Sequence, residues 1–248
     1  MWRWILVAFV LPLGGCGGPP PPDVSVLVYQ TRSDTPVRRI EIQVRNDGAE
    51  AVTVDRAELH SDRLAGTAAW DEPVRIPPGA AMDLKVQLPE PTCTAGHDEV
   101  SLTVDTQTLV VPAADPLGQF DAYIEQRCFE QAVGRTAVLR IEAVTREGIE
   151  VFTSPGVATI GQLGDTILFA PADPQAIAAP PGDRARIRTV VLRPNRCDAH
   201  ALGEDKQGTY FDVEVSLPDG RSGTYLLGVD PGMRAQLHAL YARLCGLS

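Results

Sequence analysis

The sequence lacks the features that mark several large classes of protein. After residue 13, no apolar run approaches the length of about 18 residues that a membrane-spanning helix needs. It has no Gly-x-Ser-x-Gly, no His-Glu-x-x-His and no glycine-rich phosphate loop after a strand. Positive charge is also scarce, since the net charge is −10. We therefore expect no catalytic activity and no nucleic-acid binding, because phosphate contacts need clustered Lys and Arg.

Aromatic residues are few as well, at 6% of the chain, whereas glycine (22) and proline (21) are abundant. This balance favours strands and turns over a helical bundle. Hydrophobic residues make up 44% of the 248 residues, which is ordinary for a globular protein. These proportions predict one or two globular domains that are mainly β.

The N-terminus has the three parts of a secretory signal. Arg3 supplies a positive charge, residues 4–13 are apolar apart from a proline, and small residues precede Cys16. The apolar stretch would span about 15 Å as a helix, roughly half of a hydrocarbon core, so it predicts a cleaved signal at residues 1–15. Residues 16–22 end in four prolines, which predict a stiff polyproline II tether.

The segment Leu13-Gly14-Gly15-Cys16 resembles the bacterial lipobox. In that family the cysteine becomes the N-terminus and its sulfur carries lipid. The resemblance therefore implies lipidation of Cys16 and a location on the extracytoplasmic face of the cell membrane, where several acyl chains give a stable anchor. The alternative is an ordinary signal peptide with an incidental cysteine.

Composition extends this resemblance to the whole chain. Lysine occurs only twice among 22 basic residues, while alanine, glycine and proline are abundant. Together with the lipobox and the segment at residues 197–206, this resembles lipoproteins of high-GC Gram-positive bacteria. The resemblance implies no active-site residues.

The remainder of the chain has the pattern of one unit repeated twice. Each copy contains a Pro-Pro-Gly turn, a cysteine, an Asp-Pro pair and a second cysteine, in that order. The landmarks are Pro77-Pro78-Gly79, Cys93, Asp115-Pro116 and Cys128 in the first copy, and Pro180-Pro181-Gly182, Cys197, Asp230-Pro231 and Cys245 in the second. The matched order predicts a tandem duplication. The alternative is that similar turns arose independently in an all-β protein.

Between these landmarks, alternating apolar and polar residues predict short strands. The clearest strands are expected at residues 24–29, 40–44, 52–54, 82–88, 100–104, 137–141, 185–190 and 211–215. Two segments, Asn46-Asp47-Gly48 and Pro218-Asp219-Gly220, are typical of hairpin turns. Each copy closes with a predicted helix, in which Asp115 or Asp230 is the N-cap and a proline takes the first helical position.

The apolar stripes on these two helices are interpreted as core packing rather than as cofactor sites. Strands at this spacing, with turn residues between them, are typical of β-sandwiches. The sequence therefore predicts two tandem immunoglobulin-like β-sandwich domains, at residues 23–128 and 129–248. Each is expected to end in a short α-helix attached by a disulfide.

Four cysteines remain once Cys16 is assigned to lipid, and oxidation is favoured in an exported chain. Four cysteines allow three pairings. The repeat favours one of them, in which Cys93 bonds to Cys128 and Cys197 bonds to Cys245. Each bond would attach a terminal helix to its own sandwich and contribute about 4 kcal/mol on the chain-entropy model.

Two histidines lie close to the repeated cysteines. His97 follows Cys93 and His200 follows Cys197 within a few residues. Because cysteine and histidine can chelate transition metals, a metal or small-ligand carrier that uses His97 and His200 is an alternative function. Cysteines in disulfides cannot be thiolate ligands, so we expect no metal and no cofactor. The charged segment at residues 204–208 is interpreted as a solvated turn.

An anchor, a stiff tether and two modular sandwiches point to a function in binding. The sequence predicts a non-catalytic extracytoplasmic lipoprotein that contacts the membrane through its lipid and binds a protein partner in the cell envelope. Fold analogy supplies part of this prediction. A hydrolase whose residues converge only in the fold is a third possibility.

Overall fold

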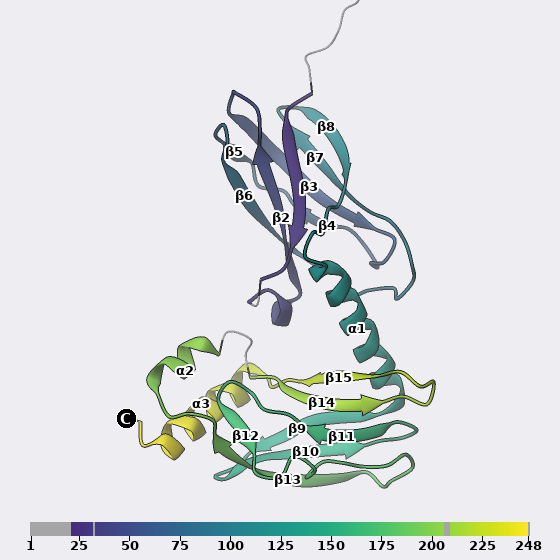
Figure 1. The fold of residues 1–248 in the computed structure, drawn as a ribbon, viewed down its shortest axis with the longest axis vertical. Helices are drawn as coiled ribbons and strands as arrows, with labels where there is room; N and C mark the ends of the chain where they lie inside the picture. Colours follow the sequence, from purple (N-terminus) through teal and green to yellow (C-terminus); the bar gives the residue numbers. More distant parts are fainter. Residues whose placement is uncertain (1–20, 32, 206–208, 248) are drawn as a thin grey trace, which may run out of the picture.

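The computed structural model describes residues 21–31, 33–205 and 209–247. It is mainly β, with several antiparallel sheets and two disulfides (Figure 1). The predicted signal peptide, Cys16 and most of the predicted tether lie outside the described residues.

The first half of the chain consists of short antiparallel strands followed by a long helix. Its elements are β1 (Val24–Tyr29), η1 (Thr35–Val37), β2 (Arg39–Asn46), β3 (Val52–Ser61), β4 (Ala68–Trp70), β5 (Val74–Ile76), β6 (Ala81–Gln87), β7 (Asp98–Val104), β8 (Gln107–Pro112) and α1 (Gln119–Thr136). One sheet has the order β1-β2-β6 and the other the order β4-β3-β7-β8, with β5 also paired to β3. Apolar residues of both sheets form one buried cluster.

The second half also consists of short antiparallel strands, and it contains two helices. Its elements are β9 (Val138–Val144), β10 (Gly148–Ser154), β11 (Thr159–Leu163), β12 (Phe169–Pro171), β13 (Arg186–Pro194), α2 (Ala199–Glu204), β14 (Phe211–Ser216), β15 (Ser222–Leu227) and α3 (Pro231–Cys245). The sheets have the orders β12-β13-β10-β9 and β11-β14-β15. They enclose a second buried cluster, to which α3 also contributes.

Strand pairing follows the same order in the two halves. The pairs β1-β2-β6 in the first half correspond to β9-β10-β13 in the second, and β3-β7-β8 correspond to β11-β14-β15. The Pro-Pro-Gly turns occupy equivalent places, directly before β6 and shortly before β13, and both of their glycines have positive φ. The halves differ after the first repeated cysteine, because only the second half inserts a helix, α2, before its next strand.

Alternation of apolar and polar residues explains why these segments are strands with one buried face. In β14, Phe211, Val213 and Val215 are buried, while Asp212 and Glu214 between them are exposed. This is the period of two that a strand needs to cover a core on one side.

Helix α1 belongs to both cores. Phe120, Tyr123 and Ile124 pack in the first cluster, whereas Ala132 and Val133 pack in the second. Helix α1 is therefore longer than the helix that the sequence predicts. The domain boundary predicted after residue 128 falls inside it. The two β halves lie at opposite ends of this helix (Figure 1).

Two local predictions are wrong. Asn46-Asp47-Gly48 does not form a hairpin, because β2 pairs with β1 and β6 while β3 belongs to the other sheet. The buried amide of Asn46 instead donates to the carbonyls of Glu50 and Ile76, at 2.7 and 3.0 Å, and so fixes a turn that crosses between sheets. Pro218-Asp219-Gly220, in contrast, does connect the paired strands β14 and β15.

The second correction concerns the start of α1. Gly118 is the N-cap, in the left-handed region, so Pro116 does not occupy the first helical position. The carboxylate of Asp115 still accepts from the free amides of Gln119 and Phe120, at 3.0 and 2.8 Å. At α3 the prediction is confirmed, since Asp230 is the N-cap and Pro231 the first residue.

Each disulfide attaches a helix to the body of its own half. Cys93, in the loop before β7, bonds to Cys128 on α1, and Cys197, before α2, bonds to Cys245 at the end of α3. These are the pairs that the repeat predicts. The first bond holds α1 close to the point where the helix passes from one core to the other.

Candidate functional site

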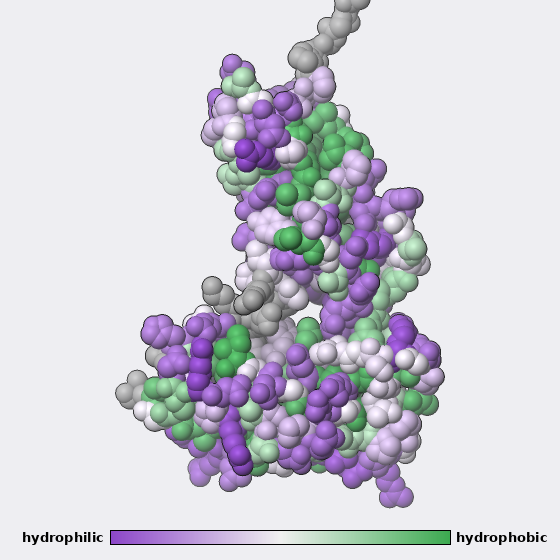
Figure 2. All heavy atoms as spheres, in the orientation of Figure 1, coloured by the Kyte–Doolittle hydropathy of each residue, from purple (hydrophilic) through white to green (hydrophobic). Residues whose placement is uncertain are grey.

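A cleft of about 930 Å³ lies between the two halves, beside α1. Figure 2 shows the surface hollowed between the upper and lower halves on this face. The cleft is lined by the segment from β1 to η1, by one face of α1, and by parts of the second half around β12, β14 and β15. Its volume is near the upper end of the range for small-molecule sites, which commonly lie between domains.

One wall of the cleft is a stripe of side chains on α1. The stripe consists of Gln119, Ala122, Tyr123, Gln126, Arg127 and Glu130. Intervals of three and four residues place them on one face of the helix. This face therefore offers amides, a phenol and an ion pair to the cleft.

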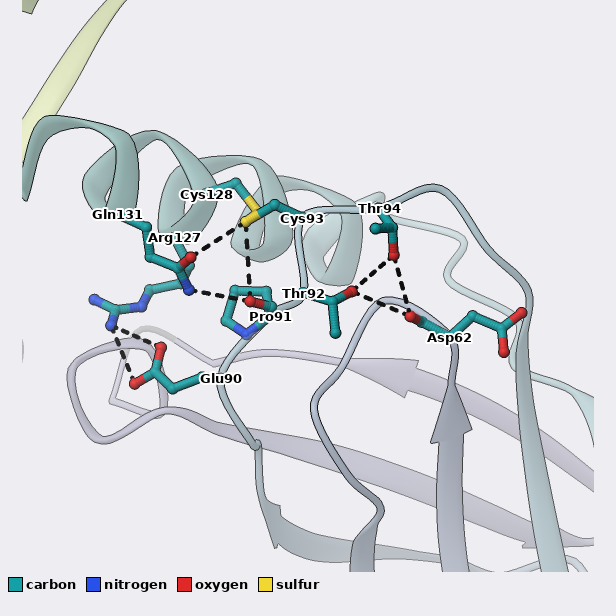
Figure 3. The surroundings of a disulfide bond; sticks show 9 residues. All are labelled: Asp62, Glu90, Pro91, Thr92, Cys93, Thr94, Arg127, Cys128 and Gln131. Atoms are coloured by element: carbon teal, nitrogen blue, oxygen red, sulfur yellow. Dashed lines mark hydrogen bonds and ion pairs between the residues drawn. A yellow bond between two sulfur atoms is a disulfide. The ribbon is translucent and has the colours of Figure 1, made fainter. Parts of the chain in front are cut away.

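Arg127 is the centre of an ion-pair network on this wall. Its guanidinium pairs with Glu130 one turn along the helix and with Glu90 at 3.3 Å (Figure 3). Gln126 donates to Glu130 at 3.0 Å and to the carbonyl of Thr224 at 2.9 Å, which ties α1 to β15. Burial alone would lower the pKa of Arg127, but the two carboxylates raise it above its usual value, so the guanidinium stays charged.

The network lies next to the first disulfide. Figure 3 shows Glu90 and Pro91 leading to Cys93, which bonds to the helix one residue beyond Arg127. Gln131 donates to the carbonyl of Pro91 at 3.1 Å and so continues the contact along α1. The loop before β7 is thus fastened to the helix by a covalent bond, a hydrogen bond and an ion pair.

Three tyrosines surround the same charges. Tyr123 comes from α1, Tyr210 lies just before β14 and Tyr225 lies within β15. Burial raises the pKa of all three phenols; Glu130 raises each further, while Arg127 lowers each. They are therefore neutral groups that can donate or accept hydrogen bonds. The hydroxyl of Tyr123 is buried and has no hydrogen-bond partner among the described residues.

Two carboxylates of the second half line the cleft without a counter-charge. Asp165 lies in the loop after β11 and Asp212 lies in β14. Among the described residues, neither side chain has an ion pair or a hydrogen bond. Although Asp212 lies on the exposed face of β14, partial desolvation raises the pKa of its carboxyl above the usual value, and no described charge opposes the shift.

A further carboxylate at the cleft, Asp205, is fully engaged. It is 4% exposed. It accepts from the amide and hydroxyl of Thr209, at 3.0 and 2.6 Å, and lies 3.0 Å from Nε2 of His238. Burial would raise the pKa of Asp205, but the hydrogen bonds from His238 and Thr209 lower it below its usual value.

This arrangement corrects the interpretation of residues 204–208 as a solvated turn, which is wrong for Asp205. Arg234 also donates to the carbonyl of Asp205 at 2.6 Å. Because Arg234 and His238 lie on α3, Asp205 fastens the end of α2 to that helix. Sequence alone does not show that an acidic residue in a charged run is buried there.

The site residues predicted from the sequence do not line the cleft. Cys16 lies outside the described residues. His97 is exposed in the loop before β7, and His200 is exposed on α2 in the other half. In the described part of the chain, no group of three or more His, Cys, Asp or Glu residues is placed to hold a metal ion. Nor is any described helix long and apolar enough to cross a membrane.

The sequence does not predict the cleft, because the apolar stripe of the first predicted helix indicates core packing alone. That assignment is right for Phe120 and Ile124, which are buried. The signal lies further along the helix, where Ala132 and Val133 continue an apolar pattern beyond Cys128. A helix with apolar residues at both ends and a polar, charged middle predicts contact with two separate cores.

Comparison with known proteins yields distant structural similarities. No family model and no curated protein matches the chain. Red sea bream transglutaminase is 10% identical, with a TM-score of 0.26 over 84% of this chain and 31% of the enzyme. The chain thus spans about a third of that structure.

Two pilus-type chaperone structures are similarly distant. The YadV chaperone is 10% identical, with a TM-score of 0.23 over 82% of this chain and 99% of that one. The CsuC–CsuE chaperone–tip adhesion subunit complex from Acinetobacter baumannii is 8% identical, with a TM-score of 0.21 over 82% and 98%. TM-scores this low do not establish a shared fold and carry no argument about activity.

Proposed function

We propose that this chain is a non-catalytic lipoprotein, anchored by lipid at Cys16 to the extracytoplasmic face of the membrane. Its two halves, residues 23–128 and 129–248, are tandem immunoglobulin-like β-sandwich domains. It binds a protein partner of the cell envelope in the cleft between them. The cleft is the observation that carries this proposal, because it joins both halves in one polar, partly buried surface.

Strand order supports the immunoglobulin-like assignment. The second half pairs β9-β10-β13-β12 in one sheet and β11-β14-β15 in the other. Numbered along the chain, this is the ABED and CFG arrangement of constant-type immunoglobulin sandwiches. The first half has the same ABE and CFG strands, with β4 added beside β3. The shared order also supports the duplication.

The disulfides support export, since such bonds persist in oxidising compartments. They also bear on binding. One bond fixes α1, which forms a wall of the cleft, and the other fixes α3, which holds Asp205. A binding site gains affinity when its walls are ordered before the partner arrives, because less entropy is lost on association.

The direction of the first strand supports the orientation that an N-terminal anchor would impose. Residues 21–23 lead into β1 at the end of the first half that is far from the second half (Figure 1). The cleft begins at the other end of that strand, at Gln30 and Thr31. A tether before residue 23 would therefore hold the first half toward the membrane and leave the cleft facing away from it.

Photocrosslinking in intact cells tests the proposal. A benzoylphenylalanine is placed at Ile167, which lines the cleft and is 38% exposed, or at Ile187, which is 57% exposed on β13 and does not line it. We expect a reproducible crosslinked protein from the Ile167 position alone. No product, or the same product from both positions, would contradict a partner in the cleft.

The anchor is tested separately. A Cys16→Ala variant is expected to leave the membrane fraction, while the wild-type chain stays in it. If both chains fractionate with the membrane, lipid at Cys16 is not what holds the protein there.

A further inference from the structure

We infer that the cleft receives a cationic group, a primary ammonium or a guanidinium, at the carboxylates of Asp165 and Asp212. This inference deepens the proposed function and rests on it, because it names the chemistry by which the partner is recognised. A lysine or arginine side chain of a protein and a free amine share this chemistry.

The first step is a balance of the charges that line the cleft. Both arginines are already neutralised, since Arg38 pairs with Glu90, and Arg127 pairs with Glu90 and Glu130. Glu130 is therefore committed as well. No lining cation in the described residues is left to receive an anion.

The remaining acidic residues of the lining differ in whether they have a partner. Asp205 is satisfied by Thr209 and His238. Asp165 and Asp212 have no described side-chain partner, so the unpaired charge among the described lining residues is negative. An anionic ligand would be repelled here, whereas a cation would complete two pairs.

The segments that carry the two free carboxylates are in contact. The backbone amide of Gly164 donates to the carbonyl of Asp212 at 2.6 Å, and a Cβ at position 164 would lie 3.2 Å from the Cβ of Asp212. The residue after this glycine is Asp165. Both residues line the cleft, so its wall carries free carboxylates from two chain segments.

The state of Asp212 supports the same conclusion. Asp212 lies on the exposed face of β14 and its carboxyl is only partly desolvated; this raises its pKa, and no described positive group opposes the shift. A bound ammonium or guanidinium would do so. Binding should therefore weaken as acid protonates Asp212. The described charged groups lining the cleft, which would also respond to pH, are the paired ones named above.

Other walls of the cleft suit the N–H groups of such a cation. An ammonium brings three donors and a guanidinium five. The buried hydroxyl of Tyr123 has no described partner and lies in the lining. The ring of Tyr210 lies against Gly228, where a Cβ would come within 2.6 Å of it. An aromatic ring in the wall adds attraction for a cation near its face.

Calorimetric titration of the full-length protein in mild detergent tests the inference. The probes are spermidine, as a free amine, and an end-blocked Lys-Lys-Lys peptide, as the side-chain source. Monoacetylated 1,4-butanediol serves as the uncharged control. We expect at least one cationic probe to bind one site and the uncharged probe not to bind. Asp212→Asn and Asp165→Asn should each weaken binding about tenfold or more.

The matched control is Glu214→Gln. Glu214 lies on the same strand and face as Asp212, carries the same charge, and does not line the cleft. This variant should bind within about twofold of the wild type. Binding of the peptide but not spermidine would assign the cation to a protein side chain, and the reverse to a free amine; either supports the inference.

Two results would overturn it. One is the absence of binding by both cationic probes. The other is an equal loss in Asp212→Asn and Glu214→Gln, which would indicate nonspecific attraction to a chain of net charge −10. Crosslinking at Ile167 separates this failure from failure of the proposed function, because a partner could still occupy the cleft without using a cation.

Discussion

Removing the first disulfide should destabilise the first half of the molecule without affecting the second. In the Cys93→Ala/Cys128→Ala variant, the unfolded chain regains the freedom of a loop whose ends are 35 residues apart. The chain-entropy model gives about 4 kcal/mol for a loop of this size. For an m value of about 2 kcal/mol/M, the urea midpoint should fall by about 2 M.

The sequence provides a reporter for this half. Trp70 is the only tryptophan after residue 4, and it packs against the first core. Urea unfolding followed by Trp70 fluorescence therefore reports on the first half, while far-ultraviolet circular dichroism reports on both. The matched control is Cys197→Ala/Cys245→Ala, which opens a loop of 48 residues in the second half.

The control should leave the Trp70 midpoint within about 0.3 M of the wild type, because its loop lies in the other core. It should lower the circular dichroism transition of the second half instead. An equal fall of the Trp70 midpoint in both variants would refute the reasoning, since it would show that the two cores unfold as one cooperative unit. So would the absence of any fall in the first variant.

The direction of the stability change can be predicted for three other perturbations. Gly228→Ala should lower the free energy of unfolding by about 1–3 kcal/mol, because the new Cβ meets the ring of Tyr210. Gly134→Ala in α1, where a Cβ has nothing within 4 Å, should be neutral or stabilising, and thermal unfolding by circular dichroism compares the two variants. The pKa of Asp205 is lowered in the folded protein, so its carboxylate stabilises the fold above the usual carboxyl pKa, and this stability is lost as pH falls through the pKa of the folded state. The difference in unfolding free energy between the wild type and Asp205→Asn, measured in urea, should therefore shrink toward pH 3. Burial raises the pKa of Glu41, so the ionised carboxylate destabilises the folded state above the usual pKa. The Glu41→Gln variant should therefore have a higher Tm than the wild type at pH 7 but not near pH 4.

The strands, both disulfide pairs and the general β character can be predicted from the sequence because each depends on local or repeated signals. Alternation of apolar residues determines which face of β14 is buried. Cysteine pairing follows from landmarks that recur in the same order, and the bonds Cys93–Cys128 and Cys197–Cys245 are formed. The lipid at Cys16 and the duplication itself stay predictions.

The cleft could not be predicted in the same way, because it depends on contacts between segments far apart in the chain. Glu90 and Arg127 meet only because the disulfide brings the loop before β7 to α1. Asp205 is buried only because α3 returns beside it with Arg234 and His238. No spacing along the sequence carries this information. The failed hairpin at Asn46 has the same cause, since the amide of Asn46 donates to the carbonyl of Ile76 at the end of β5, 30 residues away in the chain.

The shared helix determines what can enter the cleft. Ile124 packs in the first core and Val133 in the second, and at about 1.5 Å per residue these positions are about 13 Å apart along α1. The disulfide at Cys128 holds the helix between them, so the two halves are set apart by rigid structure rather than by a flexible linker. A partner that enters the cleft must therefore fit walls that are already held in place, and less entropy is lost when it binds. The carboxylates of Asp165 and Asp212 belong to these walls and would meet a cationic group of that partner.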